Sequence, residues 1–592
     1  MPSSLDALLA DLESARNQFG RGAAGRVERL LKQIARHEFR DAKRLIRLHE
    51  SLLFLRAFPQ SASLVPKIEK LLDSFHERVE KLRALGADMS IFDDFDTSGI
   101  AGTTMQDTLN FEAARWLVRR IPRQVAIAWD DYEEERAWGA TWPRFIPLLR
   151  EDSDVEANIP WRRWLDAARG RERDLPWLIR QFESLRSTGG QGGEDRARAE
   201  LYDSLRIPLR WNLENLKLSR TRNWQRPRKV YVHEGPLIVR RQVSLAEELA
   251  RPKPRFTRLS RQAGEAVMDL IREVMVVRYR ELYGTTLGDA RSVVRAELGR
   301  GVMIYFWNLP PQRRLPLRAY VAGFTLKNGV PINYIEAIGL CEWIEVGFNT
   351  FYTYRQGETA WIYSQALRCL CALTGAKVIS IYPYQIGQDN DEALDSGAFW
   401  FYRKLGFHSG KAELERLAGR EERKIAADSA HRTSRAILKR LAEAHVFYEL
   451  RGDGSRAEGA KDAGAWHTFS TRNLALRVNQ RMGQHFNGDI ARIREASVRE
   501  VSRALGLNPS GWTEAERRSL EEWSLVLALI PDLGCRSPEE KSGLVQIIRS
   551  QSARDEIQYL RRTQRHARLR RELLRLGSRA PIKLVERRPG AG

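Results

Sequence analysis

The feature that most constrains this chain is an aromatic run that ends at a glycine, Asp395-Ser396-Gly397-Ala398-Phe399-Trp400-Phe401-Tyr402-Arg403-Lys404-Leu405-Gly406-Phe407. The run predicts one helix. Asp395 can accept hydrogen bonds from its first turn, and Gly406 can adopt the left-handed conformation that ends it. Ala398 and Tyr402 are four residues apart and share a face. A small residue beside a phenol suits a helix that a ligand approaches closely. The plainer interpretation is a buried aromatic helix.

The residues before this helix alternate between strand and helix patterns. Asn328-Gly329 between two apolar runs predicts a β-hairpin, because this pair favours the tight turn that joins two strands. A helix over 359–373 can end at Gly375. The remaining expected elements are a hairpin over 229–239, an amphipathic helix over 261–283, strands over 301–307, 317–326, 332–338 and 377–384, and an aromatic segment over 341–354 that is extended at its end.

The aromatic helix and this order of elements resemble the GNAT superfamily of acyl-CoA-dependent N-acyltransferases. The last motif of that family is Asn or Asp, two residues, Ala, three residues, Tyr, three residues and Gly-Phe, and all five positions match here. The resemblance covers residues 229–410. It implies an α+β fold, with a GNAT-like mixed β-sheet core between two mostly helical regions, 1–228 and 411–592. A glycine-rich stretch at 187–194 predicts a flexible break in the first region.

The resemblance also implies a reaction, in which an acyl group passes from acyl-CoA, such as acetyl-CoA, to an amine. Tyr402 would protonate the departing thiolate, and Ala398 would lie against the cofactor. One of Glu336, Glu342 and Glu345 would take the proton from the amine, and Glu336 and Glu345 are preferred. The plainer interpretations are a tyrosine that packs its helix and glutamates that lie on the surface.

A second part of the resemblance is the turn that opens the helix over 359–373. GNAT proteins hold the coenzyme A pyrophosphate on a turn with Gln or Arg, two residues, Gly, one residue and Gly or Ala. With Arg355 first, Ala360 fits the last position, but Glu358 stands where the glycine belongs; with Gly357 as the glycine, Tyr354 and Thr359 occupy the first and last positions. The turn Arg355-Gln356-Gly357-Glu358-Thr359-Ala360 is the predicted pyrophosphate site, because backbone N–H groups at a helix N-terminus attract anions. The alternative is an ordinary helix start.

Size and charge bound the partners of this chain. Its 592 residues suffice for three or four domains, and its net charge of +22 favours an acidic partner such as nucleic acid, anionic lipid or a phosphorylated cofactor. The last region holds an arginine-rich stretch over 559–579, whose helices could grip RNA phosphates. A solvated face of packed helices explains the same stretch.

Several classes of site and location find no support in the sequence. The four cysteines show no metal-binding spacing, so a structural zinc and an oxidising compartment are not expected. His233 and His408 are isolated and receive no role, and Asn349 either orients a substrate or completes a turn. The N-terminus lacks a signal-peptide pattern, and no window is apolar enough to cross a membrane. We therefore expect a cytoplasmic protein.

Two other functions stay open. GNAT-like folds also use aminoacyl-tRNA as a donor, which the positive charge would suit. Alternatively, an inactive GNAT-like core could serve as a scaffold that binds nucleic acid or a protein partner. Salt-sensitive tRNA binding without coenzyme A binding would favour the first of these functions, and an inert Tyr402→Phe variant would favour the second.

Overall fold

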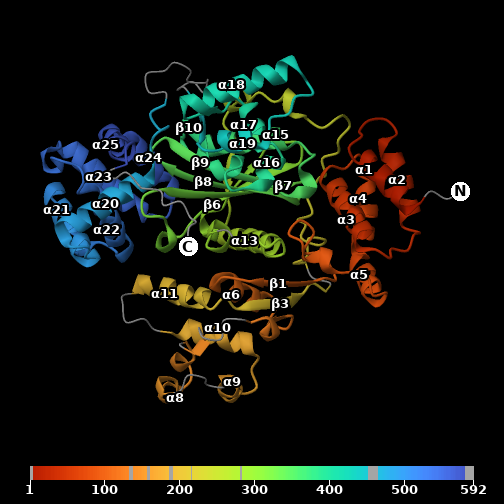
Figure 1. The fold of residues 1–592 in the computed structure, drawn as a ribbon, viewed down its shortest axis with the longest axis horizontal. Coiled ribbons are helices and arrows are strands. Elements are labelled where there is room, and N and C mark those ends of the chain that lie inside the picture. The colour runs from red at the N-terminus through yellow and green to blue at the C-terminus, as the bar shows by residue number, and fades with distance from the viewer. Residues whose placement is uncertain are drawn as a thin grey trace.

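The fold was analysed in a computed structural model, which describes residues 4–132, 138–139, 141–155, 161–185, 191–214, 217–280, 283–450 and 464–580. It combines helices with one large mixed β-sheet and one small antiparallel sheet, in agreement with the predicted α+β class. Figure 1 shows the large sheet at the centre, the N-terminal helices on one side of it and the C-terminal helices on the other. Within these ranges, no helix is long and apolar enough to span a lipid bilayer.

Nine strands form the large sheet, in the order β11-β12-β10-β9-β8-β7-β6-β5-β4. Neighbouring strands are antiparallel, except that β9 and β10 are parallel. The strands are β4 (Phe256–Arg258), β5 (Val294–Glu297), β6 (Val302–Asn308), β7 (Ala319–Lys327), β8 (Val330–Leu340), β9 (Trp343–Thr350), β10 (Val378–Ile381), β11 (His408–Ser409) and β12 (Val446–Glu449). Strand β12 lies beyond residue 410, so the sheet continues past the end of the predicted core.

The predicted hairpin at Asn328-Gly329 is confirmed. Strands β7 and β8 pair directly across it, and both turn residues have positive φ, 49° for Asn328 and 77° for Gly329. These values belong to the turn that matches the twist of the flanking strands. A side chain on Gly329 would lie 1.8 Å from the Gln225 carbonyl oxygen, so the turn also packs too closely for another residue.

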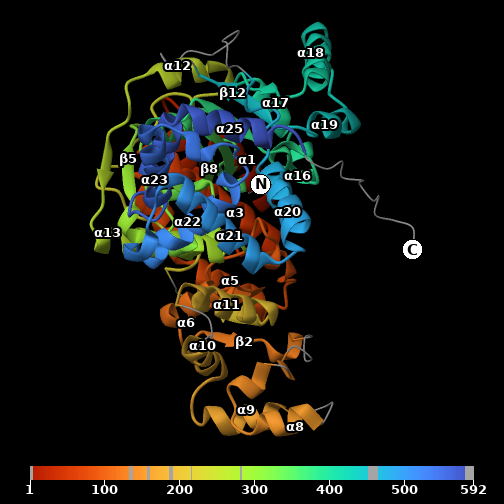
Figure 2. The same ribbon diagram turned by 90° about the vertical axis from the view of Figure 1, so that its left-hand side faces the viewer.

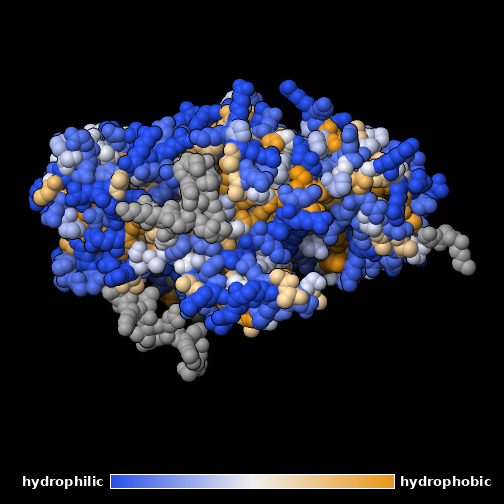
Figure 3. Space-filling model, turned by 90° about the horizontal axis from the view of Figure 1, so that it is seen from above, coloured by the Kyte–Doolittle hydropathy of each residue, from blue (hydrophilic) through white to orange (hydrophobic). Residues whose placement is uncertain are grey.

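Helices cover both faces of the large sheet. Helix α13 (Arg261–Val276) packs under β6, β7 and β8, and α15 (Thr359–Thr374) lies on the opposite face (Figure 1). As predicted, α15 ends at Gly375 in the left-handed conformation. The other helices around the sheet are α12 (Leu245–Ala250), α14 (Tyr283–Thr286), α16 (Asp391–Asp395), α17 (Ala398–Arg403), α18 (Ala412–Ala427) and α19 (Arg435–Leu441). Figure 3 looks down on the side of α18, where the surface is mostly hydrophilic with patches of hydrophobic residues.

The predicted aromatic helix is two short helices. Asp395 ends α16 instead of capping the motif helix, and it pairs with Arg435. Gly397, with φ of 67°, precedes α17, because a left-handed residue there turns the chain between the two helices. The stop after the motif is as predicted: Gly406 has φ of 100°, and the Phe407 N–H donates to the Tyr402 carbonyl.

The predicted hairpin over 229–239 is wrong. The backbone there forms no strand. Its N–H groups are used by distant segments: Tyr231 donates to Asn328 Oδ1 at 2.8 Å, and His233 donates to the Pro59 carbonyl at 3.0 Å. The segment therefore runs as a strap between the N-terminal helices and the β7–β8 turn.

The first 228 residues form helices and, contrary to expectation, a small sheet. Strands β1 (Thr104–Thr108), β2 (Val125–Ile127) and β3 (Pro208–Asn212) pair in the order β1-β3-β2. Residues 187–190 of the predicted break lie outside the described residues, and 191–194 belong to α11. The helices are α1 (Leu5–Ala15), α2 (Ala23–Ile34), α3 (Ala42–Ala57), α4 (Leu64–Asp73), α5 (Phe75–Ala84), α6 (Phe111–Arg120), α8 (Leu149–Val155), α9 (Trp161–Arg169), α10 (Asp174–Ser184) and α11 (Gln191–Ser204).

The C-terminal helices pack against the sheet, where α24 (Glu556–Arg565) contacts β7 and β8. Figure 2 shows them clustered in front of it, well apart from α8 and α9. Within this cluster Trp466 stacks on Trp343 of β9, with ring centroids 5.4 Å apart. The helices are α20 (Thr471–Phe486), α21 (Ile490–Leu505), α22 (Glu514–Leu527), α23 (Pro538–Gln551), α24 (Glu556–Arg565) and α25 (Ala567–Gly577).

Candidate active site along strand β9

Strands β9 and β10 pair only briefly. Their parallel register runs from Trp343 opposite Val378 to Glu345 opposite Ser380, and β10 ends at Ile381. Among the described residues, positions 346–350 of β9 therefore pair only with β8. This leaves one backbone edge of β9 without a strand beside it, at the point where the two parallel strands part.

The side chains of β9 alternate between two sheet faces. One face of β9 carries Glu345, Gly347 and Asn349. Their partners on β8 pair in turn with β7 residues such as Tyr320 and Phe324, which lie in the core beside α13. We call this side of the sheet the α13 face. Phe348 points to the opposite face, called the α15 face, and its ring lies 4.8 Å from that of Tyr363 in α15.

Glu345 forms a pair with a histidine on the α13 face. Its Oε2 lies 2.9 Å from Nε2 of His445, which immediately precedes β12, and its Oε1 lies 3.5 Å from Arg318. The Glu345 side chain is 16% exposed and that of His445 is 32% exposed, so the pair is reachable from solvent. A carboxylate that orients an imidazole is the usual arrangement of a general base.

Glu336 lies on the same face but is enclosed. It accepts a hydrogen bond from the hydroxyl of Tyr320, and burial raises the pKa of its carboxyl. Burial and the adjacent Glu336 charge raise the pKa of Tyr320 well above its ordinary value. Glu336 is therefore part of a buried hydrogen-bonded pair, and of the preferred glutamates Glu345 is the more accessible.

Tyr402 lies on the α15 face in a cluster of aromatic rings. Its ring centroid is 5.7 Å from that of Tyr363 and 5.8 Å from that of Phe407. The side chain is buried, and burial raises the pKa of its phenol. No contact among the described residues joins Tyr402 to Glu345, which lies on the other face. Ala398, half-buried, precedes Tyr402 by one turn of α17.

The predicted pyrophosphate turn packs against the N-terminal helices. Gln356 accepts hydrogen bonds from Arg16 and Asn17, and a side chain on Gly357 would meet the Phe58 ring at 2.5 Å. Arg355 is exposed, Thr359 donates to the Arg355 carbonyl, and Ala360 is buried in the first turn of α15. The start of α15 has no side-chain cap.

Glu358 points away from any ligand at this turn. Its carboxylate is fully buried, and it pairs with Arg300 and, at 3.3 Å, with Lys327. Burial alone would raise the pKa of Glu358, but the hydrogen bond from Arg300 and the charge of Lys327 outweigh it and lower the pKa. The negative charge at the family's glycine position is thus neutralised inside the protein.

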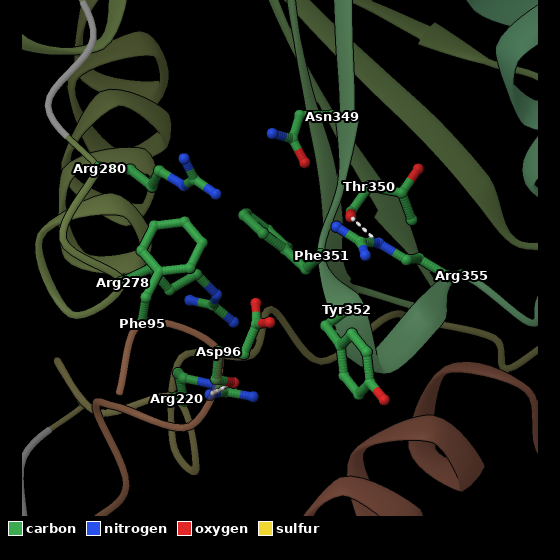
Figure 4. A pocket seen from close by; sticks show the side chains of 10 residues that line it. All are labelled: Phe95, Asp96, Arg220, Arg278, Arg280, Asn349, Thr350, Phe351, Tyr352 and Arg355. Carbon is green, nitrogen blue, oxygen red and sulfur yellow. Dashed lines mark hydrogen bonds between the residues drawn. The ribbon is translucent and has the colours of Figure 1, made fainter. Parts of the chain in front are cut away.

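A small pocket, partly open to solvent, lies where β9 ends (Figure 4). Four arginines line it, from three parts of the chain: Arg220, Arg278 and Arg280, and Arg355. Its other lining residues are Phe95, Asp96, Asn349, Thr350, Phe351 and Tyr352. The sheet, the segment that follows α13 and the N-terminal region therefore each contribute to one cationic pocket.

Two of these arginines already have acidic partners. Arg220 pairs with Glu50 at 2.7 Å and donates to the Asp96 carbonyl, and Arg355 pairs with Glu392. The Asp96 carboxyl is half-buried, and burial raises its pKa.

The guanidinium groups of Arg278 and Arg280 each lie over an aromatic ring. Arg278 lies 4.3 Å from the centroid of Phe351 and donates to the Val274 carbonyl, and Arg280 lies 3.5 Å from the centroid of Phe95. Neither has a carboxylate within ion-pair distance in the part of the chain that the structure describes. Burial, reinforced by the charge of Arg220, lowers the pKa of Arg278 to about 9. An anion in this pocket would supply the missing countercharge.

The arginine-rich stretch over 559–579 is largely used in packing. Arg561 donates to the Leu373 carbonyl at 2.8 Å, Arg570 donates to Glu342 at 2.6 Å, and Arg568 pairs with Glu540 at 3.2 Å. Its leucines Leu560, Leu569, Leu573 and Leu576 are buried. RNA binding by this stretch stays a prediction.

Sequence reasoning missed His445 and three of the pocket arginines, Arg220, Arg278 and Arg280. No local pattern marks them, since each acquires its place only when distant segments meet. Comparison of the chain with protein-family models, with curated proteins and with solved structures finds no match.

Proposed function

We propose that this protein transfers an acyl group from an acyl-CoA thioester to an amine. The observation that carries the proposal is the pair of arginines, Arg278 and Arg280, that line the pocket at the end of β9 without an acidic partner among the described residues. Guanidinium groups bind phosphate oxygens strongly, so the pocket suits the phosphates of coenzyme A. The GNAT resemblance assigns the acyl-CoA chemistry to this part of the fold.

The rest of the donor would extend along β9. From Asn349, which lines the pocket, the α13 face continues through Gly347 to Glu345, four residues or about 13 Å along the strand. A methyl group on Gly347 would touch only Gln385 at 3.8 Å and a backbone oxygen at 4.0 Å. The absence of a side chain there leaves room for an extended arm beside the unpaired edge of β9.

Glu345 and His445 stand at the far end of this path, where the thioester would lie. His445, oriented by Glu345, would take a proton from the ammonium group of the acceptor. The free amine then attacks the thioester carbonyl carbon, so that a C–N bond forms and the C–S bond breaks, while the amine nitrogen gives its second proton to solvent. The electron pair of the broken bond leaves with the sulfur.

Tyr402 would protonate this thiolate, as the GNAT resemblance implies. Burial keeps its phenol protonated, which is the form that a general acid needs. Because Tyr402 lies on the α15 face and Glu345 on the α13 face, the sulfur would lie beside the part of β9 that does not pair with β10.

The experiment is a turnover assay with the full chain, acetyl-CoA and a panel of primary amines. Free thiol is followed optically, and the acylated amine is identified by mass. We expect thiol release that depends on both the amine and the enzyme, with one acylated amine formed per thiol. If acetyl-CoA binds but no amine in a broad panel is acylated, the transferase proposal fails and the scaffold alternative gains support.

A further inference from the structure

Two histidines and a glutamate, to which the proposed acyl transfer assigns no role, converge near one end of the large sheet. His408 lies in β11, Glu449 ends β12, and His467 lies in the segment that leads into α20. Their ligand atoms all lie within 4.8 Å of one another. The three residues span sixty positions of the sequence, so only the fold brings them together.

The sheet itself fixes two of the three. His408 pairs with Phe447 across β11 and β12, and Glu449, two residues farther along β12, points to the same face as Phe447. The ring of His467 packs on Phe447 with centroids 4.5 Å apart, and it lies 5.2 Å from the ring of His408. The strand register and the packing of the rings thus bring the three potential metal ligands close together.

The surroundings hold these side chains in place. The Gly464 N–H donates to Glu449 Oε1 at 2.8 Å, which orients the carboxylate. Trp466, next to His467, stacks on Trp343 and donates to Glu342 at 2.7 Å. Such outer hydrogen bonds are what tune and orient metal ligands in proteins.

One ring nitrogen of the cluster points to a missing ligand. Nε2 of His467 is buried and has no hydrogen-bond partner among the described residues, and its nearest carboxylate oxygen, on Glu449, is 3.7 Å away. A buried polar atom is normally satisfied, so an unsatisfied nitrogen facing a carboxylate calls for an additional group between them.

We propose that His408, Glu449 and His467 bind a divalent transition-metal ion, and that Zn²⁺ fits best. Two imidazoles and one carboxylate are a set that zinc accepts with a fourth position open. Zinc bonds of about 2.1 Å in a tetrahedral site place ligand atoms roughly 3.4 Å apart. The Glu449–His467 distance of 3.7 Å is already close to this value, and the ligand atom of His408 lies within 4.8 Å of both.

A bound ion would link strands β11 and β12, at the edge of the sheet, to the segment that precedes the C-terminal helices. His445 directly precedes β12 and Glu449 ends it, so the two residues are four positions or about 13 Å apart along the chain. The ion therefore has no place in the acyl-transfer step, and its loss would lower stability without removing the proposed base. This inference is independent of the proposed function.

The test uses the untagged full chain, stripped with a chelator and dialysed. Metal content after reloading with Zn²⁺ is measured by mass spectrometry, and Co²⁺ is titrated to observe the visible absorption of a tetrahedral site. We expect one equivalent of zinc in the wild type. His467→Gln and Glu449→Gln should weaken binding at least tenfold, while His485→Gln, a change at an exposed histidine in α20, should leave it unchanged.

Circular dichroism and gel filtration would check that the variants fold. Should a ligand variant fail to fold, the wild-type titration still decides. Less than a tenth of an equivalent of zinc, or Co²⁺ spectra without tetrahedral bands, would overturn the proposal. Equal loss of binding in His485→Gln would show that the metal binds adventitiously, and this result too would overturn it.

Discussion

Glu345 Oε2 lies 2.9 Å from His445 Nε2, although one hundred positions separate the two residues in the chain. Glu345 is the last β9 residue paired with β10, and His445 directly precedes β12 on the other side of β10. The parallel strand β10 thus lies between the elements that contribute the pair. This arrangement places an oriented imidazole where the two parallel strands part, beside the edge along which we propose that the donor binds.

His445→Gln should lower the turnover number for amine acylation by about 10²-fold or more, because general-base catalysis contributes this much. The Michaelis constant for acetyl-CoA should stay within a few-fold, since His445 lies far from the arginine pocket. Glu345→Gln should have a smaller effect, because the imidazole stays in place and loses only the carboxylate that orients it. Steady-state kinetics over pH 6 to 9 would measure both, with His37→Gln as the control. Unchanged turnover in His445→Gln would remove this residue from the mechanism.

Tyr402→Phe removes one oxygen from a buried aromatic cluster. If the phenol protonates the thiolate, turnover should fall about tenfold or more while the melting temperature changes little. Comparison with Tyr363→Phe, a change at the neighbouring buried tyrosine, separates catalysis from packing. Equal activities of wild type and Tyr402→Phe would support the view that this tyrosine only packs its helix.

Glu556, at the start of α24, is fully buried 3.6 Å from Arg314. Burial raises its pKa from 4.5 to about 8. The stability tied to its protonated form is therefore complete below pH 4.5 and is lost as the pH rises through 8. Glu556→Gln should thus melt higher than wild type at pH 8.5 and gain less at pH 5. Thermal melts at both pH values would check this. An increase in melting temperature that is the same at both pH values, or larger at pH 5, would contradict the raised pKa of Glu556.

Arg561 caps the C-terminus of α15 by donating to the Ala372 and Leu373 carbonyls. Arg561→Ala should lower the free energy of unfolding by about 1 kcal/mol, because an exposed charged hydrogen bond at a helix end contributes this much. Arg565→Ala, an exposed change in the same helix, serves as the control. Denaturant unfolding measures both. If Arg561→Ala instead leaves stability unchanged but weakens RNA binding, the tail acts in binding rather than in packing.

Local signals predicted the elements whose cause is local. The β7–β8 hairpin follows from Asn328-Gly329, and the end of α15 follows from Gly375, since both depend on backbone conformations that few residues adopt. The aromatic motif gave the correct stop at Gly406 but the wrong start. The left-handed Gly397 separates Asp395 from the helix that it was expected to cap.

The features that could not be predicted from the sequence depend on contacts between residues far apart in the chain. Strand β1 pairs with β3 across about a hundred residues, so its alternation alone could not distinguish it from a loop. The same holds for the pocket, whose arginines come from positions 220, 278, 280 and 355, and for His408, which was assigned no role because its partners are Glu449 and His467. Each group becomes visible only when the register of the sheet is known.

The most direct test of the account is calorimetric titration of coenzyme A into wild type, Arg278→Met and Arg280→Gln, with Arg261→Gln at the other end of α13 as the control. We predict stoichiometric binding to wild type and to Arg261→Gln. Either pocket variant should bind at least tenfold more weakly, because each loses a charged contact to phosphate. Adding inorganic pyrophosphate should compete with coenzyme A in wild type. Absence of binding to wild type, or equal affinity in all four proteins, would contradict the acyl-CoA account.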